Sequence, residues 1–371
     1  MNFIRSMKVN ICANRIKPLY QVSDHVMIIW SRGEIGQYDL TSKRIISRIR
    51  VSSHGQKLIS AFRIMERLFR LESRSIEAIT DKIFIFSFQG AIYKADFLSH
   101  LLVREQTLPK GMSNPLSLSK IENMDSFEDS IVYGEYRSNN DKKPVSVYSR
   151  NLQLDGHWEK VYQFEQGTIN HIHSIIPDRF RKVVYILTGD DDESSGIWVA
   201  RDNWKTVEPL LVGKQLYRSC FALVQEEGLT FVTDTPFQQN AVYFIDMTSS
   251  LSNIPIMIKK ISGSCIYGTY SEDQLLFSTT VEPDAKMKFY RYLFTKRRGA
   301  GILDDKVHVY CGNNKKGYKE IVTAKKDKFP MGLLQFGSVQ FPVNSYQKFH
   351  KAYAYFTATN KLDGKWGEFY V

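Results

Sequence analysis

Short runs of Val, Ile, Tyr and Phe alternate along the whole chain with turns rich in Gly, Asn, Asp, Ser and Lys. Runs such as KIFIFSF, KVVYILTG and AVYFID have the length and the β-branched and aromatic content that are typical of strands. A helical period is rare, and its best example is residues 58–72, LISAFRIMERLFRLE, whose second half also fits a strand. The pattern therefore predicts an all-β protein.

The predicted strands fall into groups that recur along the chain. The first strands of the groups begin near residues 18, 66, 117, 170, 217, 263 and 331, and most intervals are about 46–53 residues. One clear group reads INHIHSII, KVVYILTG, GIWVAR and KTVEPLLV. Four strands per group at this period indicate a β-propeller of about seven four-stranded blades, and six blades remain the alternative because the first 60 residues are weakly patterned.

The last group contains only three strand-like runs, MGLLQFGSVQF, KAYAYFTAT and KWGEFYV. The N-terminal run MKVNICA, residues 7–13, is the candidate for its fourth strand, because pairing of the first and last segments closes the ring and removes open sheet edges. The similar stretches LDGHWEKVY and LDGKWGEFY then form turns at two different positions of a blade. Since no linker interrupts the pattern, we expect residues 1–371 to form a single propeller domain.

Residues 200–207, ARDNWKTV, resemble the Asp-box of sialidase-like (BNR-repeat) propellers, whose pattern is S-x-D-x-G-x-T-W. Asp202 and Thr206 match the pattern, and the other three defined positions differ. A looser copy is VYSRNLQLDGHWEKVY. The resemblance covers two blades and implies a structural hairpin between the third and fourth strands of a blade. It also implies a carbohydrate-active relative of that family.

True sialidases combine an arginine triad for a carboxylate with an Asp acid/base and a Tyr–Glu nucleophile pair. Residues 62–64, Phe-Arg-Ile, are similar to the start of the family's F-R-I-P element, but Met65 replaces the proline. Three triad arginines cannot be placed on this sequence. Sialidase activity itself is therefore not predicted.

The formal net charge of +11 is concentrated in one segment. Residues 286–328 contain 13 Lys or Arg residues and four Asp or Glu residues, which gives that segment a charge of +9. A basic surface of this kind favours an anionic partner such as an acidic glycan, a sugar nucleotide, a phosphate or an anionic membrane. The alternative is a solvated basic face. Nucleic acid is not the expected partner, because the segment contains no recognition module.

Other sequence features exclude several classes of protein. The four cysteines are widely spaced and fit small buried side chains in a reducing compartment better than a disulfide framework. The sequence lacks an apolar stretch of about 20 residues and a secretory h-region, so we expect a soluble, cytoplasmic protein without a transmembrane segment. P-loop, dinucleotide-binding, zinc-finger and α/β-hydrolase motifs are missing from the sequence.

Several polar residues are expected on one face of the propeller, where the loops between second and third strands open. We predict catalytic roles for five of them and substrate-binding roles for six. The catalytic candidates are Glu135, Tyr136, His171, His173 and Asp234, and the substrate-binding candidates are Arg218, Asp190, Tyr267, Gln335, Arg297 and Arg298.

The chemistry of these residue types suits an acidic sugar. His171 and His173 are two residues apart, so they share one side of a strand, where an imidazole can act as a base near neutral pH. The same pair could bind a metal with a nearby carboxylate, although we predict no cofactor and keep a divalent cation as the weaker alternative. Glu135 and Arg218 would supply a carboxylate and a carboxylate-binding guanidinium. Structural hydrogen bonding is the alternative role for each of these residues.

The leading hypothesis is a carbohydrate-active or glycan-binding propeller that recognises an acidic glycan or sugar intermediate. If the protein is an enzyme, a glycosidase or a polysaccharide lyase is expected. The alternative hypothesis is a non-catalytic propeller scaffold that docks a protein or membrane partner through the basic residues 286–328.

Overall fold

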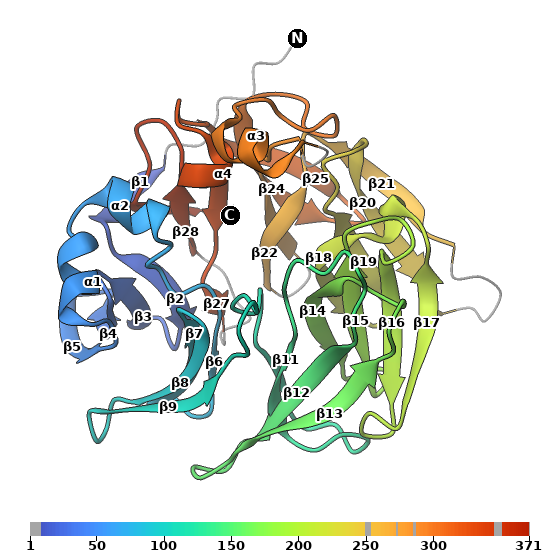
Figure 1. Cartoon of the computed structure of the whole chain (residues 1–371), viewed down its shortest axis with the longest axis horizontal. Helices are drawn as coiled ribbons and strands as arrows, with labels where there is room; N and C mark the ends of the chain where they lie inside the picture. Colours follow the sequence, from blue (N-terminus) through green and yellow to red (C-terminus); the bar gives the residue numbers. More distant parts are fainter. Residues whose placement is uncertain (1–8, 249–253, 272–273, 285–286, 345–350, 371) are drawn as a thin grey trace. The chain divides into compact units, whose positions relative to one another are not determined.

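The computed structural model describes residues 9–248, 254–271, 274–284, 287–344 and 351–370. Within these residues the chain is an all-β protein whose seven sheets are the blades of a β-propeller (Figure 1). The predicted fold class and the number of seven blades are confirmed. Residues 7–8 of the predicted N-terminal strand and Lys286 of the basic segment lie outside the described residues.

The chain divides into two compact units, which are described separately below. The first unit contains residues 1–72, 234–242 and 257–371, and the second unit contains residues 73–233 and 243–256. The single domain expected for residues 1–371 stays a prediction.

The second unit contains three sheets of four strands each, and the four strands of every sheet are consecutive in the chain. Their strands are β6 (Ile76–Ala78), β7 (Ile83–Phe88), β8 (Ala91–Asp96) and β9 (Leu101–Thr107); β10 (Ser119–Ile121), β11 (Ser130–Gly134), β12 (Val145–Asn151) and β13 (Trp158–Phe164); and β14 (His171–Asp178), β15 (Val183–Gly189), β16 (Gly196–Arg201) and β17 (Thr206–Val212). All neighbouring strands in these sheets are antiparallel.

A further sheet has its residues divided between the two units, and a single 3-10 turn precedes it. The turn is η1 (Gln215–Tyr217), and the strands are β18 (Ser219–Gln225), β19 (Gly228–Thr233), β20 (Asn240–Asp246) and β21 (Ile256–Ile261).

The first unit contains the other three sheets, in the orders β27-β2-β3-β4-β5, β22-β23-β24-β25 and β1-β29-β28-β26. Their strands are β1 (Asn10–Asn14), β2 (Lys17–Gln21), β3 (Val26–Ser31), β4 (Glu34–Asp39), β5 (Arg44–Arg50), β22 (Cys265–Ser271), β23 (Gln274–Thr279), β24 (Lys306–Asn313), β25 (Gly317–Lys325), β26 (Ser338–Gln340), β27 (Val343–Asn344), β28 (Lys351–Thr357) and β29 (Lys365–Tyr370). Strand β1 pairs antiparallel with β29, so the N-terminal strand completes the C-terminal blade as predicted.

The two similar Asp-Gly turns lie where the strand order predicts. One turn joins β12 to β13, the third and fourth strands of their sheet, and the other joins β28 to β29, the second and third strands. The residues that resemble an Asp-box form the tight turn between β16 and β17, with Asp202, Asn203 and Trp204 in the left-handed region. Trp204 is buried edge-on against Phe127 at 5.5 Å between ring centroids, so this turn is a packing feature.

All four α-helices of the described residues are short, and they belong to the first unit. They are α1 (His54–Ile59), α2 (Arg63–Leu68), α3 (Phe289–Phe294) and α4 (Met331–Leu334). None of these helices has the length and apolarity needed to cross a bilayer.

At two stretches the positions of these helices differ from the elements that the sequence predicts. Residues 58–72 contain the end of α1 and all of α2 rather than the one helix that the period predicts. The strand group expected to begin near residue 66 is wrong in its start, because its first strand β6 begins at Ile76. The strand expected to begin at Met331 is wrong, because Pro330 starts the helix α4 and the strand β26 begins only at Ser338.

The core beneath β14 and β15 fixes the direction of the side chains that precede it. Ile172 and Ile175 on β14 and Val184 and Ile186 on β15 belong to one buried apolar cluster. A β-bulge between Ile172 and Ser174 shifts the register at this point. The bulge interrupts the strand alternation, so Ile172 and Ile175 both reach the apolar cluster, while the imidazoles of His171 and His173 meet each other.

Candidate functional site

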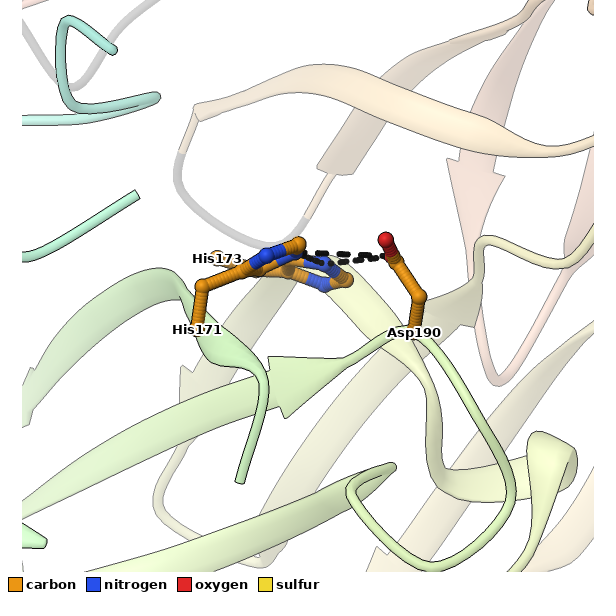
Figure 2. Close-up of side chains that lie close together, drawn as sticks. All are labelled: His171, His173 and Asp190. Carbon is orange, nitrogen blue, oxygen red and sulfur yellow. Dashed lines mark hydrogen bonds and ion pairs between the residues drawn. The ribbon is translucent and has the colours of Figure 1, made fainter. Parts of the chain in front are cut away.

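Four polar side chains come together in the second unit and are called the histidine–aspartate cluster: His171, His173, Asp190 and Arg218. The two histidines lie on β14, Asp190 directly follows β15, and Arg218 lies between η1 and β18. Figure 2 shows both imidazole rings and the Asp190 carboxylate pointing toward one another.

The distances within the cluster are short. The Nε2 atoms of His171 and His173 are 3.0 Å apart. Each of these Nε2 atoms lies 3.4 Å from Oδ1 of Asp190 (Figure 2). A terminal guanidinium nitrogen of Arg218 lies 2.8 Å from the same Oδ1, and the other donates to the Asp190 carbonyl oxygen at 2.9 Å. Asp190 is therefore held on two sides by basic groups.

The opposite edge of each imidazole faces a backbone carbonyl. Nδ1 of His171 lies 2.8 Å from the carbonyl oxygen of Arg137, and Nδ1 of His173 lies 3.0 Å from that of Ser219. Both imidazole side chains are almost fully buried, whereas half of the Asp190 side-chain surface is exposed. The cluster thus combines two buried imidazoles with one carboxylate that solvent reaches.

Charge interactions fix the ionisation of Asp190. Burial opposes ionisation, but the Arg218 guanidinium and the His171 imidazole outweigh it and hold the pKa of the Asp190 carboxyl well below its usual range. Burial lowers the pKa of His173, and the hydrogen bond with Asp190 opposes that effect without cancelling it. At neutral pH the site therefore contains an ionised carboxylate beside a His173 ring that favours its neutral form.

Hydrogen bonds from neighbouring amide side chains hold the loop that carries Asp190. Oδ1 of Asn170 accepts the backbone N–H of Asp190 at 2.8 Å, and Gln215 donates its Nε2 to the Asp190 carbonyl oxygen at 2.8 Å. Asn170 is itself held by reciprocal bonds with Asn139. The sequence analysis did not select Asn170, Gln215 or Asn139, although Asn170 directly precedes the His-x-His pair.

A glycine allows His173 to occupy its position. Gly189 pairs with His171 across β14 and β15, and a Cβ atom on Gly189 would lie 2.4 Å from Cε1 of His173. That separation is far below van der Waals contact. The absence of a side chain at residue 189 is therefore a requirement for the observed imidazole position.

Tyr136 and Glu135 lie beside the cluster, at the start of the loop between β11 and β12. The Tyr136 ring lies edge-on to the His171 ring at 4.5 Å between centroids. Glu135 is buried, and its carboxylate accepts hydrogen bonds from the backbone N–H of Ser146 at 3.1 Å and from the Tyr148 hydroxyl at 3.4 Å. Glu135 therefore has a structural hydrogen-bonding role in this structure, and its predicted catalytic role stays a prediction.

The remaining candidates lie in the first unit and are described apart from the cluster. Asp234 is buried directly after β19, Tyr267 lies on β22, and Gln335 ends α4 with a φ of 66°. Arg297 and Arg298 follow α3, and the Arg297 side chain is largely exposed, with its Nε 3.7 Å from Asp284 Oδ2. Their predicted catalytic and substrate-binding roles stay predictions.

The cysteines and the basic segment show no reactive or concentrated site. All four cysteines are free, and burial raises the pKa of the Cys12 and Cys311 thiols to about 12. Within residues 287–328 most Lys and Arg side chains are exposed, but Lys326 is buried and paired with Asp327.

No family model matches the sequence, and no curated protein is similar to it. Solved structures that resemble this chain are propellers of low sequence identity. An oligogalacturonate lyase from Vibrio parahaemolyticus is 7% identical, with a TM-score of 0.58, and the match covers 97% of this chain and 90% of the lyase.

Two further solved propellers give similar values. The propeller domain of Cps50 (Swd1) from Myceliophteria thermophila is 8% identical with a TM-score of 0.53, and the match covers 100% of this chain and 99% of that domain. The WD40 propeller domain of Doa1 is 9% identical with a TM-score of 0.54, with coverage of 97% and 96%. At these identities the likeness shows the propeller fold alone, and the Asp-box resemblance stays a prediction.

Proposed function

We propose that the second unit binds an acidic sugar residue at the histidine–aspartate cluster. One observation carries this proposal: two imidazoles, a carboxylate, a guanidinium and a phenol ring lie together. They come from β14, the loop after β15, the residue before β18 and the loop after β11. Sites that bind small ligands combine a few fixed polar groups with aromatic surface in this way.

The residue types suit the parts of an acidic sugar. Arg218 is paired with Asp190 and adds positive charge to the site, which favours a sugar carboxylate near it. The half-exposed Asp190 carboxylate accepts hydrogen bonds from sugar hydroxyls, and the Tyr136 ring offers an amphipathic surface beside it. The solved oligogalacturonate lyase with the same fold supports the proposal, since oligogalacturonate is an acidic sugar oligomer.

Oligogalacturonate and its methyl-esterified form provide the test, because esterification removes the carboxylate charge and retains the sugar ring. Binding is measured by titration calorimetry at low and moderate salt. We expect the charged form to bind more tightly, with weaker binding at higher salt. Because sialylated and sulfated glycans are also acidic, a glycan array with both classes accompanies the titration.

Arg218→Met is the informative variant, and Arg48→Met is the control because Arg48 is an exposed arginine of the first unit. Loss of binding in Arg218→Met with unchanged binding in Arg48→Met supports the proposal. No binding to any acidic glycan, or equal effects of the two substitutions, contradicts it. The lyase form of the hypothesis predicts ultraviolet absorbance from an unsaturated uronate product, and its absence contradicts that form.

A second candidate function is docking to an anionic membrane surface through the first unit. Helices α1, α2 and α3 carry several large apolar side chains that are exposed, and α2 and α3 both pack against α4 (Figure 1). These side chains form the helical surface: Leu58, Ile59, Phe62, Ile64, Met65, Phe69, Tyr290 and Phe294.

The exposed charges of residues 41–71 are positive. From residue 41 to residue 71 the chain has one acidic residue, Glu66, and it is buried, whereas Lys43, Arg44, Arg48 and Arg70 are exposed. Exposed apolar groups beside cations are typical of segments that lie in the interface of an anionic bilayer. The membrane alternative that we propose therefore uses the helical surface together with the basic residues 286–328.

Vesicle sedimentation tests this candidate. Vesicles of phosphatidylcholine mixed with phosphatidylserine should bind the protein, and vesicles of phosphatidylcholine alone should not. Phe62→Ser should reduce binding, whereas Phe180→Ser, which changes an exposed phenylalanine of the second unit, should not. Equal binding by both variants, or no binding to the anionic vesicles, contradicts the candidate function.

A further inference from the structure

The hydrogen bonds at the two imidazoles determine which nitrogen carries the proton. Nδ1 of His171 faces the carbonyl oxygen of Arg137, and Nδ1 of His173 faces that of Ser219. Because a carbonyl oxygen only accepts hydrogen bonds, each Nδ1 must carry a proton. In the neutral rings both Nε2 atoms therefore present lone pairs, and these lone pairs face each other across 3.0 Å.

The two facing nitrogens need a cation between them, which is either a proton, if one ring is an imidazolium that donates to the other, or a metal ion. A third lone-pair donor is present, because Asp190 Oδ1 lies 3.4 Å from each Nε2 atom. The three atoms form a nearly equilateral triangle with edges of 3.0, 3.4 and 3.4 Å. In a tetrahedral zinc site, bonds of about 2.0–2.2 Å separate neighbouring ligand atoms by about 3.3–3.6 Å. The two 3.4 Å edges fit this range, and the two imidazoles at 3.0 Å would move slightly apart when the ion binds.

We infer that His171, His173 and Asp190 form a site for a divalent first-row transition ion, with Zn²⁺ as the best match to the donor set and geometry. Two imidazole nitrogens and one carboxylate oxygen suit such ions, whereas Mg²⁺ and Ca²⁺ prefer oxygen ligands alone. Three protein ligands leave a coordination position for water or substrate. The Asp190 side chain is half exposed, so solvent reaches this ligand.

The surroundings of the three ligands have the features of a supported metal site. Backbone carbonyls that accept from Nδ1 fix the orientation of both rings and raise the basicity of Nε2. Arg218 orients the carboxylate through Oδ1 and the Asp190 carbonyl oxygen. Asn170 and Gln215 fix the backbone of residue 190. The same residues would bind the ion whether or not the protein binds a glycan, so this inference is independent of the proposed function.

The test uses the full chain without a histidine tag, after treatment with EDTA and removal of the chelator. Titration calorimetry with ZnCl₂ and visible absorbance with CoCl₂ measure affinity, stoichiometry and coordination geometry. We expect one ion per chain and the intense visible absorbance of tetrahedral Co²⁺. In His171→Ala and Asp190→Asn we expect the affinity to fall by more than about 100-fold, since even the loss of an outer-shell partner costs about 10–100-fold.

His157→Ala is the matched control, because His157 is an exposed histidine in the turn between β12 and β13. Thermal unfolding in EDTA shows whether each variant is folded, and the nearly isosteric Asp190→Asn keeps the test valid if an alanine variant is not. Retained affinity in Asp190→Asn and His171→Ala overturns the inference. The inference is also overturned if the unsubstituted protein binds Zn²⁺ and Co²⁺ no more tightly than a surface histidine does. A loss of binding in His157→Ala overturns it as well.

Discussion

Gly189→Ala is the most specific perturbation of the histidine–aspartate cluster, because it adds one methyl group and removes no ligand. The new Cβ atom would lie 2.4 Å from Cε1 and 2.9 Å from Nε2 of His173. Ordinary contact begins at 3.4 Å, so the imidazole must move by about 1 Å. Metal–ligand distances tolerate deviations of about 0.2 Å, and the displaced ring therefore cannot keep its position in the triangle.

We expect Gly189→Ala to weaken Zn²⁺ binding by about 10–100-fold, similar to the loss of a supporting group. Overpacking should also destabilise the protein by about 1–3 kcal/mol. Calorimetry with ZnCl₂ measures the first effect, and urea unfolding measures the second. Gly55→Ala is the control, because nothing lies within 4 Å of its Cβ position, and alanine at this helical residue should stabilise by up to about 1 kcal/mol. Zn²⁺ affinity in Gly189→Ala equal to that of the unaltered protein would refute the proposed role of residue 189.

Three other substitutions test the packing and charges of the two units. In urea titrations, Arg67→Met should lower the free energy of unfolding by about 3–5 kcal/mol, because Arg67 is buried and its guanidinium lies 2.6 Å from Asp327 and 3.1 Å from Asp363. The control Arg48→Met, at an exposed ion pair, should cost less than about 1 kcal/mol. Burial opposes ionisation of Asp363, but Arg63 holds the pKa of the Asp363 carboxyl below its usual value. The stability that the ionised form contributes is therefore present above about pH 4 and is lost as the pH falls through the lowered pKa. Asp363→Asn should therefore be less stable at neutral pH, and urea titrations at lower pH should show the deficit shrinking; a constant deficit contradicts this assignment. Trp204→Ala should cost about 3–5 kcal/mol and leave Zn²⁺ affinity unchanged, which calorimetry checks, because the turn it occupies is a packing feature.

The strand pattern predicted most of the fold because each blade repeats the same physical requirement. Alternating apolar side chains have to be buried on every strand, and turn residues have to separate the strands. The pairing of β1 with β29 followed from the missing strand of the last group. The start of that group was wrong because the short run Met-Gly-Leu-Leu at residues 331–334 fits a strand as well as a helix, and in the structure it forms α4.

The candidate site was only partly accessible to sequence reasoning. Two features of the site can be recognised in the sequence: His171 and His173 are two residues apart on a strand, and Asp190 follows a second strand. The partners of the two Nδ1 atoms cannot be recognised in the sequence, because they are the backbone carbonyls of Arg137 and Ser219 and any residue supplies a carbonyl. The bulge on β14 and the need for a glycine at residue 189 depend in the same way on three-dimensional contacts.

The most direct test of the central claim is anomalous X-ray diffraction from crystals of the full chain soaked in Zn²⁺, collected on both sides of the zinc absorption edge. The account predicts a peak about 2.0–2.2 Å from Nε2 of His171, Nε2 of His173 and Oδ1 of Asp190. A map without a peak among these three atoms, in crystals where zinc is bound elsewhere on the chain, would contradict it.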